Sequence, residues 1–276
     1  MSSKSTEGKG REKKQSGELS KSSGSSSEGA SKPTIAEMEV AVSTLGWALE
    51  TIGVTKSGII GGEAVSIYAA ECGLRPRQTK DIDLIIQPTT LSADLVSTSL
   101  TTNETVKDYF VSKRVDYVDK PHVVVIRGSG TIHIPIEIFD WQVWPERQQY
   151  YNLDWEGNEP QYCRVNNRQT PLLGPGWLIR QKILAYAQRQ NRNMADMEDI
   201  HSLRTVLDYK GVSISITDDA EVAALKTVLG APNPPDLKGY VLCEAVWPTQ
   251  WTWDAKHTSY FRYDESWEKV WSTRSE

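Results

Sequence analysis

Apolar residues recur at two different spacings along this chain, and together these spacings predict a fold of helices and strands. Recurrence every three or four residues is typical of a helix with one buried face, whereas alternation is typical of a half-buried strand. Helices are predicted at about 35–52, 62–73, 91–100, 176–186 and 197–211. Strands are predicted at 58–60, 81–86, 122–126 and 131–139. The first helix is the best marked, because Thr34 and Glu37 have the spacing of a capping box.

Turn and loop residues divide these elements into segments. Gly128-Ser129-Gly130 joins the last two strands as a hairpin, residues 146–170 have no clear period and suggest a crossover, and three prolines at 231–240 predict a loop. The expected organisation is a disordered Ser/Lys-rich tail at 1–33, a core at 34–145, a crossover with a helical lobe at 146–230, and a Trp-rich extension at 231–276. Trp267 and Trp271 are four residues apart, which favours a packed helix face over a platform that stacks bases.

Composition and charge restrict the class of protein. Residues 1–33 hold 11 serines and no aromatic residue, so they cannot bury enough apolar surface to offset their chain entropy. The tail carries 7 − 4 = +3, so the formal charge of −5 leaves −5 − 3 = −8 on the rest of the chain. An acidic body argues against a surface built mainly for nucleic acid and slightly favours a cationic or small partner.

Cysteines and apolar runs indicate the environment of the chain. The three cysteines lie far apart, with no C-x-x-C pair, so neither a disulfide framework nor a structural zinc site is expected. No stretch reaches the roughly 18 consecutive apolar residues of a membrane span, and the N-terminus lacks the apolar run of a signal peptide. We therefore expect a cytoplasmic protein with no membrane partner, and a nuclear location stays open.

Two carboxylates on one strand are the first candidate site. Asp81 and Asp83 are two residues apart, so on a strand they point to the same side while Ile82 and Leu84 enter the core. Like charges this close repel unless a cation neutralises them, and carboxylate oxygens are the ligands that Mg²⁺ or Mn²⁺ prefers. The D-x-D pattern alone is weak evidence, since many surface loops contain it.

Further residues strengthen this candidate. Gly61-Gly62 stands between a strand and a helix, where free backbone N–H groups and the helix N-terminus can bind phosphate. Glu137 is flanked by isoleucines on a later strand and is the expected third carboxylate, with Asp140 as the alternative if that strand bulges. Three carboxylates can hold two divalent cations, one orienting a triphosphate and one activating a hydroxyl.

These residues resemble a known family. The glycine pair, the Arg77-x-Thr79-x-Asp81-Ile82-Asp83-Leu84 strand and the later acid look like the nucleotidyltransferase superfamily of the DNA polymerase β type, and within it the minimal AbiEii toxin-like branch. The resemblance covers residues 58–86 and 122–140. It extends to Lys182 and to Asp196 and Asp199, which match a lysine and an acidic D-x-x-D-I helix of the family's helical lobe.

The resemblance implies a fold, a reaction and a set of residue roles. The fold is α/β of the α+β kind, a small mixed sheet flanked by helices and followed by a helical lobe. The reaction is metal-dependent transfer of a nucleoside monophosphate from an NTP, ATP being favoured, to a hydroxyl of a small molecule, RNA or protein, with release of pyrophosphate. By this resemblance the metal ligands are Asp81, Asp83 and Glu137, with Glu137 also a possible base, and the nucleotide-binding residues are Gly61, Gly62, Arg77, Thr79 and Lys182.

Other interpretations of the same residues stay open. Glu63 is an acid beside the phosphate-binding turn and would weaken nucleotide binding if it turned inward. Arg77 could pair with Asp81 or Asp83 when no metal is bound, and Lys182 could be an ordinary solvated lysine. Asp196 and Asp199 could form an exposed acidic face. The alternative functions are a degenerate nucleotidyltransferase fold that only binds or regulates and, less favoured, a nucleotide-sugar glycosyltransferase. No oligomeric state is indicated.

Overall fold

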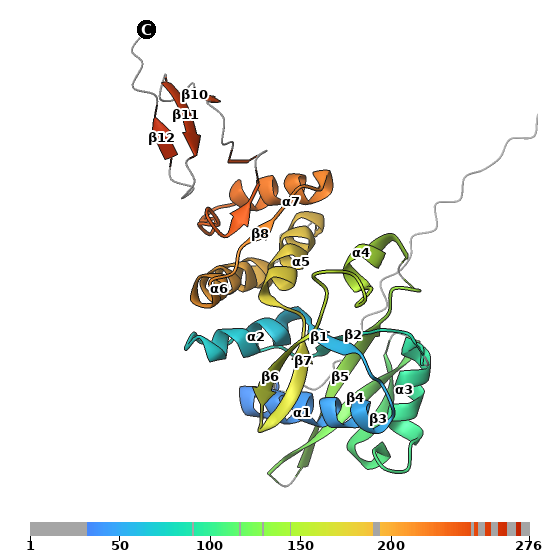
Figure 1. The fold of residues 1–276 in the computed structure, drawn as a ribbon. Helices are drawn as coiled ribbons and strands as arrows, with labels where there is room; N and C mark the ends of the chain where they lie inside the picture. Colours follow the sequence, from blue (N-terminus) through green and yellow to red (C-terminus); the bar gives the residue numbers. More distant parts are fainter. Residues whose placement is uncertain are drawn as a thin grey trace, which may run out of the picture. The chain divides into compact units, whose positions relative to one another are not determined.

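A computed structural model describes most of the chain (Figure 1). The described residues are 32–89, 91–115, 117–128, 130–143, 145–189, 194–243, 246–247, 252–254, 259–263 and 269–271. The chain divides into two units, Met1–Ser31 and Lys32–Glu276, and every described residue belongs to the second.

A mixed sheet of seven strands is the centre of the fold. In chain order its strands are β1 Ser57–Ile60, β2 Ile82–Ile86, β3 Phe110–Val115, β4 Val118–Arg127, β5 Gly130–Phe139, β6 Gln161–Val165 and β7 Arg168–Leu172. Their order across the sheet is β3-β4-β5-β2-β1-β7-β6. Strand β2 runs parallel to β5, and β1 runs parallel to β7, while the other neighbours are antiparallel. The sheet therefore brings β2 and β5, which are far apart in sequence, side by side.

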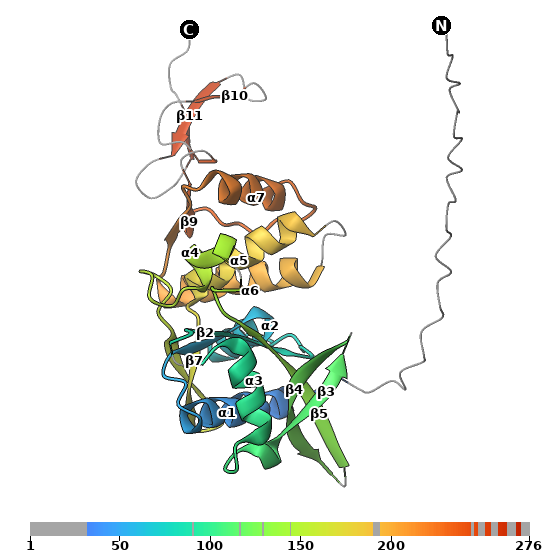
Figure 2. The ribbon, with the colours of Figure 1, turned by 90° about the vertical axis from the view of Figure 1, so that its right-hand side faces the viewer.

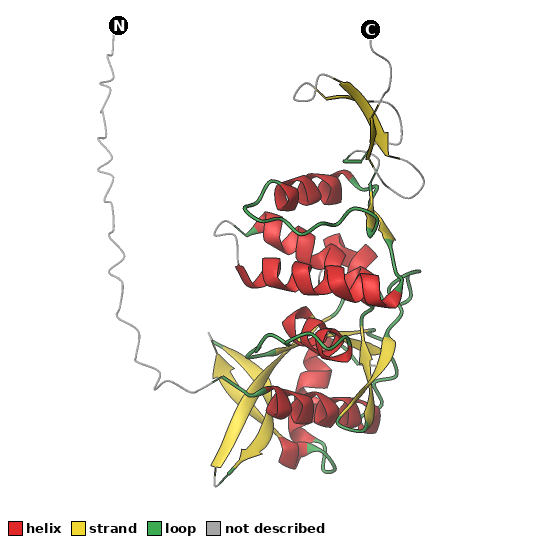
Figure 3. Ribbon diagram, turned by 90° about the vertical axis from the view of Figure 1, so that its left-hand side faces the viewer, coloured by secondary structure: helices red, strands yellow, loops and turns green. Residues whose placement is uncertain are grey.

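Helices pack on this sheet and then on one another. They are α1 Ile35–Thr51, α2 Gly61–Glu71, α3 Ala93–Thr102, α4 Gln148–Tyr151, α5 Pro175–Gln188, α6 Met194–Lys210 and α7 Asp219–Leu229, with 3₁₀ turns at Lys107–Tyr109 and Pro145–Arg147. Helix α1 packs on β4 and β7, and α3 packs on β3, β4 and β5 (Figure 2). Helix α5 packs on α6 and α7, so these three form a helical layer (Figure 3).

The remaining strands are short and lie outside the main sheet. Strands β8 Ile214–Ser215 and β9 Val241–Leu242 pair in parallel. Strands β10 Thr252–Asp254, β11 Ser259–Tyr263 and β12 Lys269–Trp271 form an antiparallel sheet of their own. No helix in the described part of the chain is long and apolar enough to cross a membrane.

One apolar core joins the sheet to the helices. It includes Leu45 of α1, Leu84 of β2, Ile136 of β5 and Ile183 of α5, all with less than 2% of their surface exposed. Burial of aliphatic side chains on this scale is the main favourable contribution to folding. Helix α1 is further fixed at its start, because Thr34 accepts a hydrogen bond from the Glu37 amide and the Glu37 carboxylate accepts one from the Thr34 amide.

The predicted α/β class, the predicted helices and the predicted hairpin of β4 and β5 are confirmed. Residues 146–170 differ from the expectation of a stretch without period, because they include α4 and the hairpin of β6 and β7. Strand β7 continues to Leu172 and extends the sheet beside β1. The helical interpretation of the C-terminal tryptophans is wrong for Trp271, which lies in strand β12. Trp267 lies outside the described residues, and so do residues 1–31 of the tail predicted at 1–33. The predicted domain boundaries stay predictions.

Candidate active site

The ends of three strands place the predicted acids on one face of the sheet. Asp83 is the second residue of β2 and lies opposite Ile60, the last residue of β1. On its other side Asp83 lies opposite Glu137 of the parallel strand β5. Residues in register on neighbouring strands point to the same face. Asp81 precedes β2 by one residue and shares the face of Asp83, as the sequence spacing predicts, while Ile82 and Leu84 are fully buried.

The electrostatics of Asp83 show how close these groups lie. The pKa of Asp83 is raised to about 7, first by burial and then by the negative charges of Asp81 and Glu137, while Lys182 and Arg189 oppose the rise. Two carboxylates and two cations are therefore near enough to Asp83 to act on its charge. In this environment a bound cation would stabilise the charged form of the Asp83 carboxylate.

Gly61 has two structural reasons to be glycine. Its backbone φ is +70°, in the left-handed region that favours glycine, and a Cβ atom built there would lie 2.0 Å from Oδ2 of Asp83. A Cβ on Gly62 would lie 2.4 Å from an Nη atom of Arg77. The glycine pair thus leaves room for the Asp83 carboxylate and the Arg77 guanidinium at the N-terminus of α2, where backbone N–H groups stay unpaired.

The third carboxylate, Glu137, is paired with a lysine. Its side chain, 38% exposed, forms an ion pair with Lys120 of β4. The alternative acid, Asp140, is 1% exposed and accepts hydrogen bonds from the backbone amides of Ala93 and Val143, at 3.1 and 2.9 Å. Asp140 therefore holds the start of α3 in place, and it is Glu137 that faces Asp83.

Glu63 does not turn toward the acids. It is 4% exposed and accepts a 2.8 Å hydrogen bond from the Thr79 hydroxyl. Burial raises the pKa of Glu63 to about 7, the Thr79 hydrogen bond opposes this, and Glu39 adds to it. Thr79, predicted to bind nucleotide, is also buried, and its hydroxyl is bonded to Glu63 of α2.

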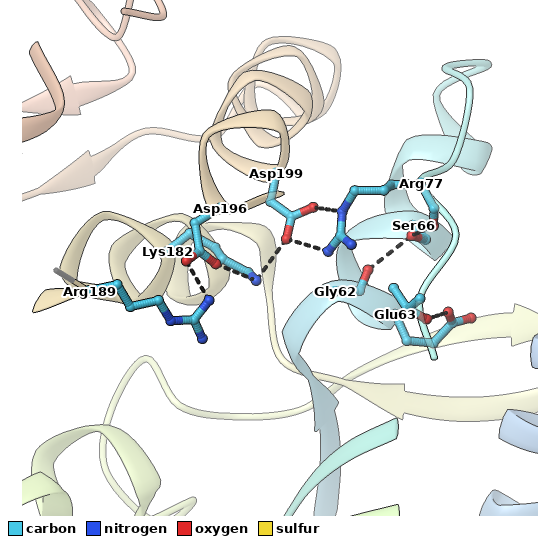
Figure 4. A network of polar contacts seen from close by, with 9 residues as sticks. Gly62, Glu63, Ser66, Arg77, Lys182, Arg189, Asp196 and Asp199 are labelled. Atoms are coloured by element: carbon cyan, nitrogen blue, oxygen red, sulfur yellow. Dashed lines mark hydrogen bonds and ion pairs between the residues drawn. The ribbon is translucent and has the colours of Figure 1, made fainter. Parts of the chain in front are cut away.

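A buried network connects the sheet to the helical layer (Figure 4). Asp199 of α6 accepts two hydrogen bonds from the Arg77 guanidinium, at 2.9 and 3.0 Å, and forms an ion pair with Nζ of Lys182 at 2.7 Å. Lys182 also contacts Asp196 at 3.1 Å, and Asp196 contacts Arg189 at 2.6 Å. Three cations thus meet two carboxylates, which leaves the network with a net positive charge of one.

This network corrects three alternatives from the sequence. Asp196 and Asp199 are each 1% exposed, so they are not an exposed acidic face. Arg77 pairs with Asp199 rather than with Asp81 or Asp83. Lys182 has a side chain 13% exposed and is not an ordinary solvated lysine. Sequence reasoning did not single out Lys120 or Arg189 as site residues, because a lone basic residue carries no signal until its neighbours in space are known.

The acids at this site carry the type of donor atom that binds a divalent cation. Asp81, Asp83 and Glu137 supply carboxylate oxygens, the donors suited to Mg²⁺ or Mn²⁺, and their mutual repulsion would be relieved by a cation. As the side chains stand, no group of three or more His, Cys, Asp or Glu within the described residues is gathered closely enough to hold a metal. The fit therefore rests on Asp81 and Asp83, with Glu137 turned aside to Lys120.

Among solved structures, the chain is similar to the crystal structure of an antigenic nucleotidyltransferase-like protein from Paracoccidioides brasiliensis. The two share 26% sequence identity with a TM-score of 0.65, over 76% of this chain and 96% of the other. No family model matches the chain, and no curated protein matches it. The likeness shows that this chain has a nucleotidyltransferase-like fold and supports that general class of function.

Proposed function

We propose that this protein is a metal-dependent nucleotidyltransferase that transfers a nucleoside monophosphate from an NTP to a hydroxyl acceptor and releases pyrophosphate. Asp81 and Asp83 would hold Mg²⁺ or Mn²⁺, with Glu137 as the third carboxylate. The carrying observation is the placement of Asp83 between Glu137 on β5 and the glycine turn after β1. ATP is the favoured nucleotide. Membership of the AbiEii-like branch is also proposed, because the similarity to the solved structure supports only the general nucleotidyltransferase-like fold.

The phosphate end of the nucleotide has candidate partners on the β1 side of Asp83. The N-terminus of α2 at Gly61 and Gly62 offers unpaired backbone N–H groups and the positive end of the helix dipole. The network around Lys182 has one positive charge in excess and lies near enough to lower the pKa of Asp83. A triphosphate bound there would have its negative charge neutralised by the turn and by this network.

The chain's own residues would divide the chemical work as follows. A bound divalent cation supplies electrostatic stabilisation of the charge that develops on the transferred phosphoryl group. Asp81 and Asp83 would hold that cation. Glu137, once released from Lys120, would accept the proton of the attacking hydroxyl, and Lys182 would neutralise the leaving pyrophosphate.

Thermal melting with each NTP, with and without Mg²⁺ or Mn²⁺, tests the proposal. A ligand at about 100 times its Kd stabilises the native state by roughly 2.7 kcal/mol, so a filled site should raise the melting temperature clearly. The shift should require metal and should disappear in Asp81→Asn/Asp83→Asn. Asp94→Asn/Asp108→Asn, a matched double change at positions outside the site, should keep it. A metal-dependent shift that survives in the site variant would contradict the proposal.

A catalytically degenerate module is the second candidate, and one observation favours it. Lys120 already neutralises Glu137, and no compact group of three acids exists among the described residues. Such a module would bind nucleotide without turnover. Pyrophosphate release from the preferred NTP in the presence of acceptor extracts separates the two candidates, since the enzyme releases it and the module does not. The fold likeness offers nothing for a glycosyltransferase.

A further inference from the structure

Glu137, the third acid of the proposed site, already has a cation beside it. Its carboxylate contacts the ammonium group of Lys120, which lies on the neighbouring strand β4. Asp83 of β2 is in register with Glu137 on the other side. Because β5 lies between β2 and β4, Lys120 and Asp83 flank Glu137 on opposite sides. The contact with Lys120 therefore directs the Glu137 carboxylate away from Asp83.

The next strand of the sheet favours this orientation of Lys120. Lys113 of β3 is in register with Lys120, so the two lysines lie on the same face of the sheet. Burial lowers the pKa of His122 on this face, and the positive charges of Lys113 and Lys120 lower it too, so both ammonium groups lie near that side chain. Like charges placed opposite each other repel. Lys120 thus has a cation on one side and the Glu137 carboxylate on the other, and pairing with Glu137 is the favourable arrangement.

The charges of the three acids are balanced by Lys120 and a single divalent cation. Asp81, Asp83 and Glu137 together carry three negative charges when ionised, and one dication plus the Lys120 ammonium carry three positive charges. A second dication at Glu137 would lie beside Lys120 and would be repelled by it. The pair of Lys120 with Glu137 therefore disfavours a second metal ion before any nucleotide is bound.

The geometry of a two-metal site leads to the same conclusion. Two catalytic metal ions lie about 3.5 to 4 Å apart and share carboxylate ligands. A second ion this close to the first would need Glu137 as a ligand in addition to Asp81 and Asp83. Within the described residues these acids do not gather into a group that could hold a metal, because Glu137 is drawn to Lys120.

We propose that the Lys120 ammonium takes the place of the second divalent cation, so that the three acids hold one metal ion, at Asp81 and Asp83. This inference rests on the proposed nucleotidyl transfer and revises the two-cation site expected from the sequence. Lys120 neutralises Glu137 while metal and NTP bind, and the release of Glu137 from Lys120 belongs to the later proton transfer. Lys120 acts through Glu137 and is a positioning residue.

Counting bound metal ions tests the inference without requiring turnover. The full-length protein is titrated with Mn²⁺, and free Mn²⁺ is measured by electron paramagnetic resonance. Wild type should bind one Mn²⁺ per chain. Lys120→Met removes the charge and should allow a second Mn²⁺ to bind at least about tenfold more tightly than in wild type, because a unit positive charge no longer repels it. Lys120→Arg, which restores the charge, should return the count to one.

Two further variants make the count specific to the pair. Lys113→Met is the matched control, because Lys113 is an exposed lysine on the same face and one strand further from Glu137. It should bind one Mn²⁺, as wild type does. Lys120→Met/Glu137→Gln should lose the second Mn²⁺, since that ion needs the Glu137 carboxylate. The Lys120 and Glu137 side chains are 31% and 38% exposed, and pairs this exposed contribute little to stability, so these variants should fold.

The outcomes separate this inference from the proposed function. Two Mn²⁺ ions in wild type, one in Lys120→Met, or an equal gain in Lys120→Met and Lys113→Met would each overturn the inference. In these cases a metal-dependent NTP shift that requires Asp81 and Asp83 leaves the proposed function standing. Absence of both Mn²⁺ binding and the NTP shift in wild type contradicts the proposed function and the role of Lys120 together.

Discussion

Glu63 is a buried carboxyl at the start of α2 that accepts a hydrogen bond from the Thr79 hydroxyl. Burial raises its pKa from the ordinary value of 4.5 to about 7. The native state therefore holds a proton that the unfolded state releases, and stability falls as pH rises from about 4.5 to about 7. Glu63→Gln removes this loss and keeps a hydrogen-bond acceptor for Thr79.

We expect Glu63→Gln to match wild type near pH 4.5 and to exceed it at pH 8 by about 2 to 3 kcal/mol in the free energy of unfolding. Urea denaturation at both pH values measures the difference. Glu50→Gln, on the exposed side of α1, is the control and should give no difference that depends on pH. A variant as stable as wild type at pH 8 would show that Glu63 is solvated in the native protein.

Gly61 is the position in the site where an added side chain would have the least room. Gly61→Ala would place a Cβ atom 2.0 Å from Oδ2 of Asp83 in a backbone with φ of +70°. Gly73→Ala is a close control, because Gly73 has φ of +71° and nothing within 4 Å of an added Cβ. Both variants should lose about 1 to 2 kcal/mol of stability from backbone strain.

Only Gly61→Ala should also lose the metal-dependent thermal shift with NTP, since only there does the added atom displace Asp83. Thermal melting of both variants, with and without Mg²⁺ and NTP, makes the comparison. Equal shifts in the two variants would mean that Asp83 accommodates the new atom and that the close approach has no part in binding.

One buried carboxylate of α6 pairs with basic residues from two other segments of the chain. Asp199 is 1% exposed and neutralises Arg77 of the loop before β2 and Lys182 of α5. Removing its charge leaves Arg77 without this carboxylate partner and leaves Lys182 paired with Asp196. Breaking a buried pair costs about 3 to 5 kcal/mol. Because Arg77 is 30% exposed and partly solvated, Asp199→Asn should cost about 2 to 4 kcal/mol.

Chemical denaturation of Asp199→Asn beside Asp208→Asn checks this expectation. Asp208 lies on the same helix, 56% exposed, and pairs with Arg204 at 3.7 Å. An exposed pair of this kind is worth at most about 1 kcal/mol. If the two variants lose the same free energy of unfolding, the network around Asp199 does not hold α6 in place.

Elements with a local signal could be predicted from the sequence, and elements without one could not. Helix α1 was predicted from its capping box and its apolar spacing, and β2 from alternation at 81–86. Strand β6 was missed because only Cys163 and Val165 of its five residues are buried, while Gln161, Tyr162 and Arg164 are exposed. Two buried positions are too few to show an alternation. A strand near the edge of a sheet has one neighbour to define it, and that neighbour is not visible in the local pattern.

The candidate site divides in the same way. Asp81, Asp83 and the glycine turn belong to one continuous stretch, so their spacing alone predicts that they meet. The burial of Asp199 depends on Arg77, which is 122 residues earlier, and on packing between α5 and α6. Long-range pairing of this kind is set by tertiary structure, so the sequence left open whether Asp199 was part of an exposed acidic face, whereas the fold buries it.

At the scale of the whole molecule, the sheet, the helical layer and the candidate site all lie within residues 32–276. Residues 1–31 hold 11 serines and no aromatic residue, so they offer little apolar surface to the core. A chain that begins at Lys32 should therefore keep the melting temperature of the full chain within about 1 °C, since about 1 kcal/mol shifts it by 2 to 4 °C at this size. It should also keep the metal-dependent NTP shift. Melting of both chains side by side tests this, and a lower melting temperature in the shortened chain would show that the first 31 residues contribute to the stability of the fold.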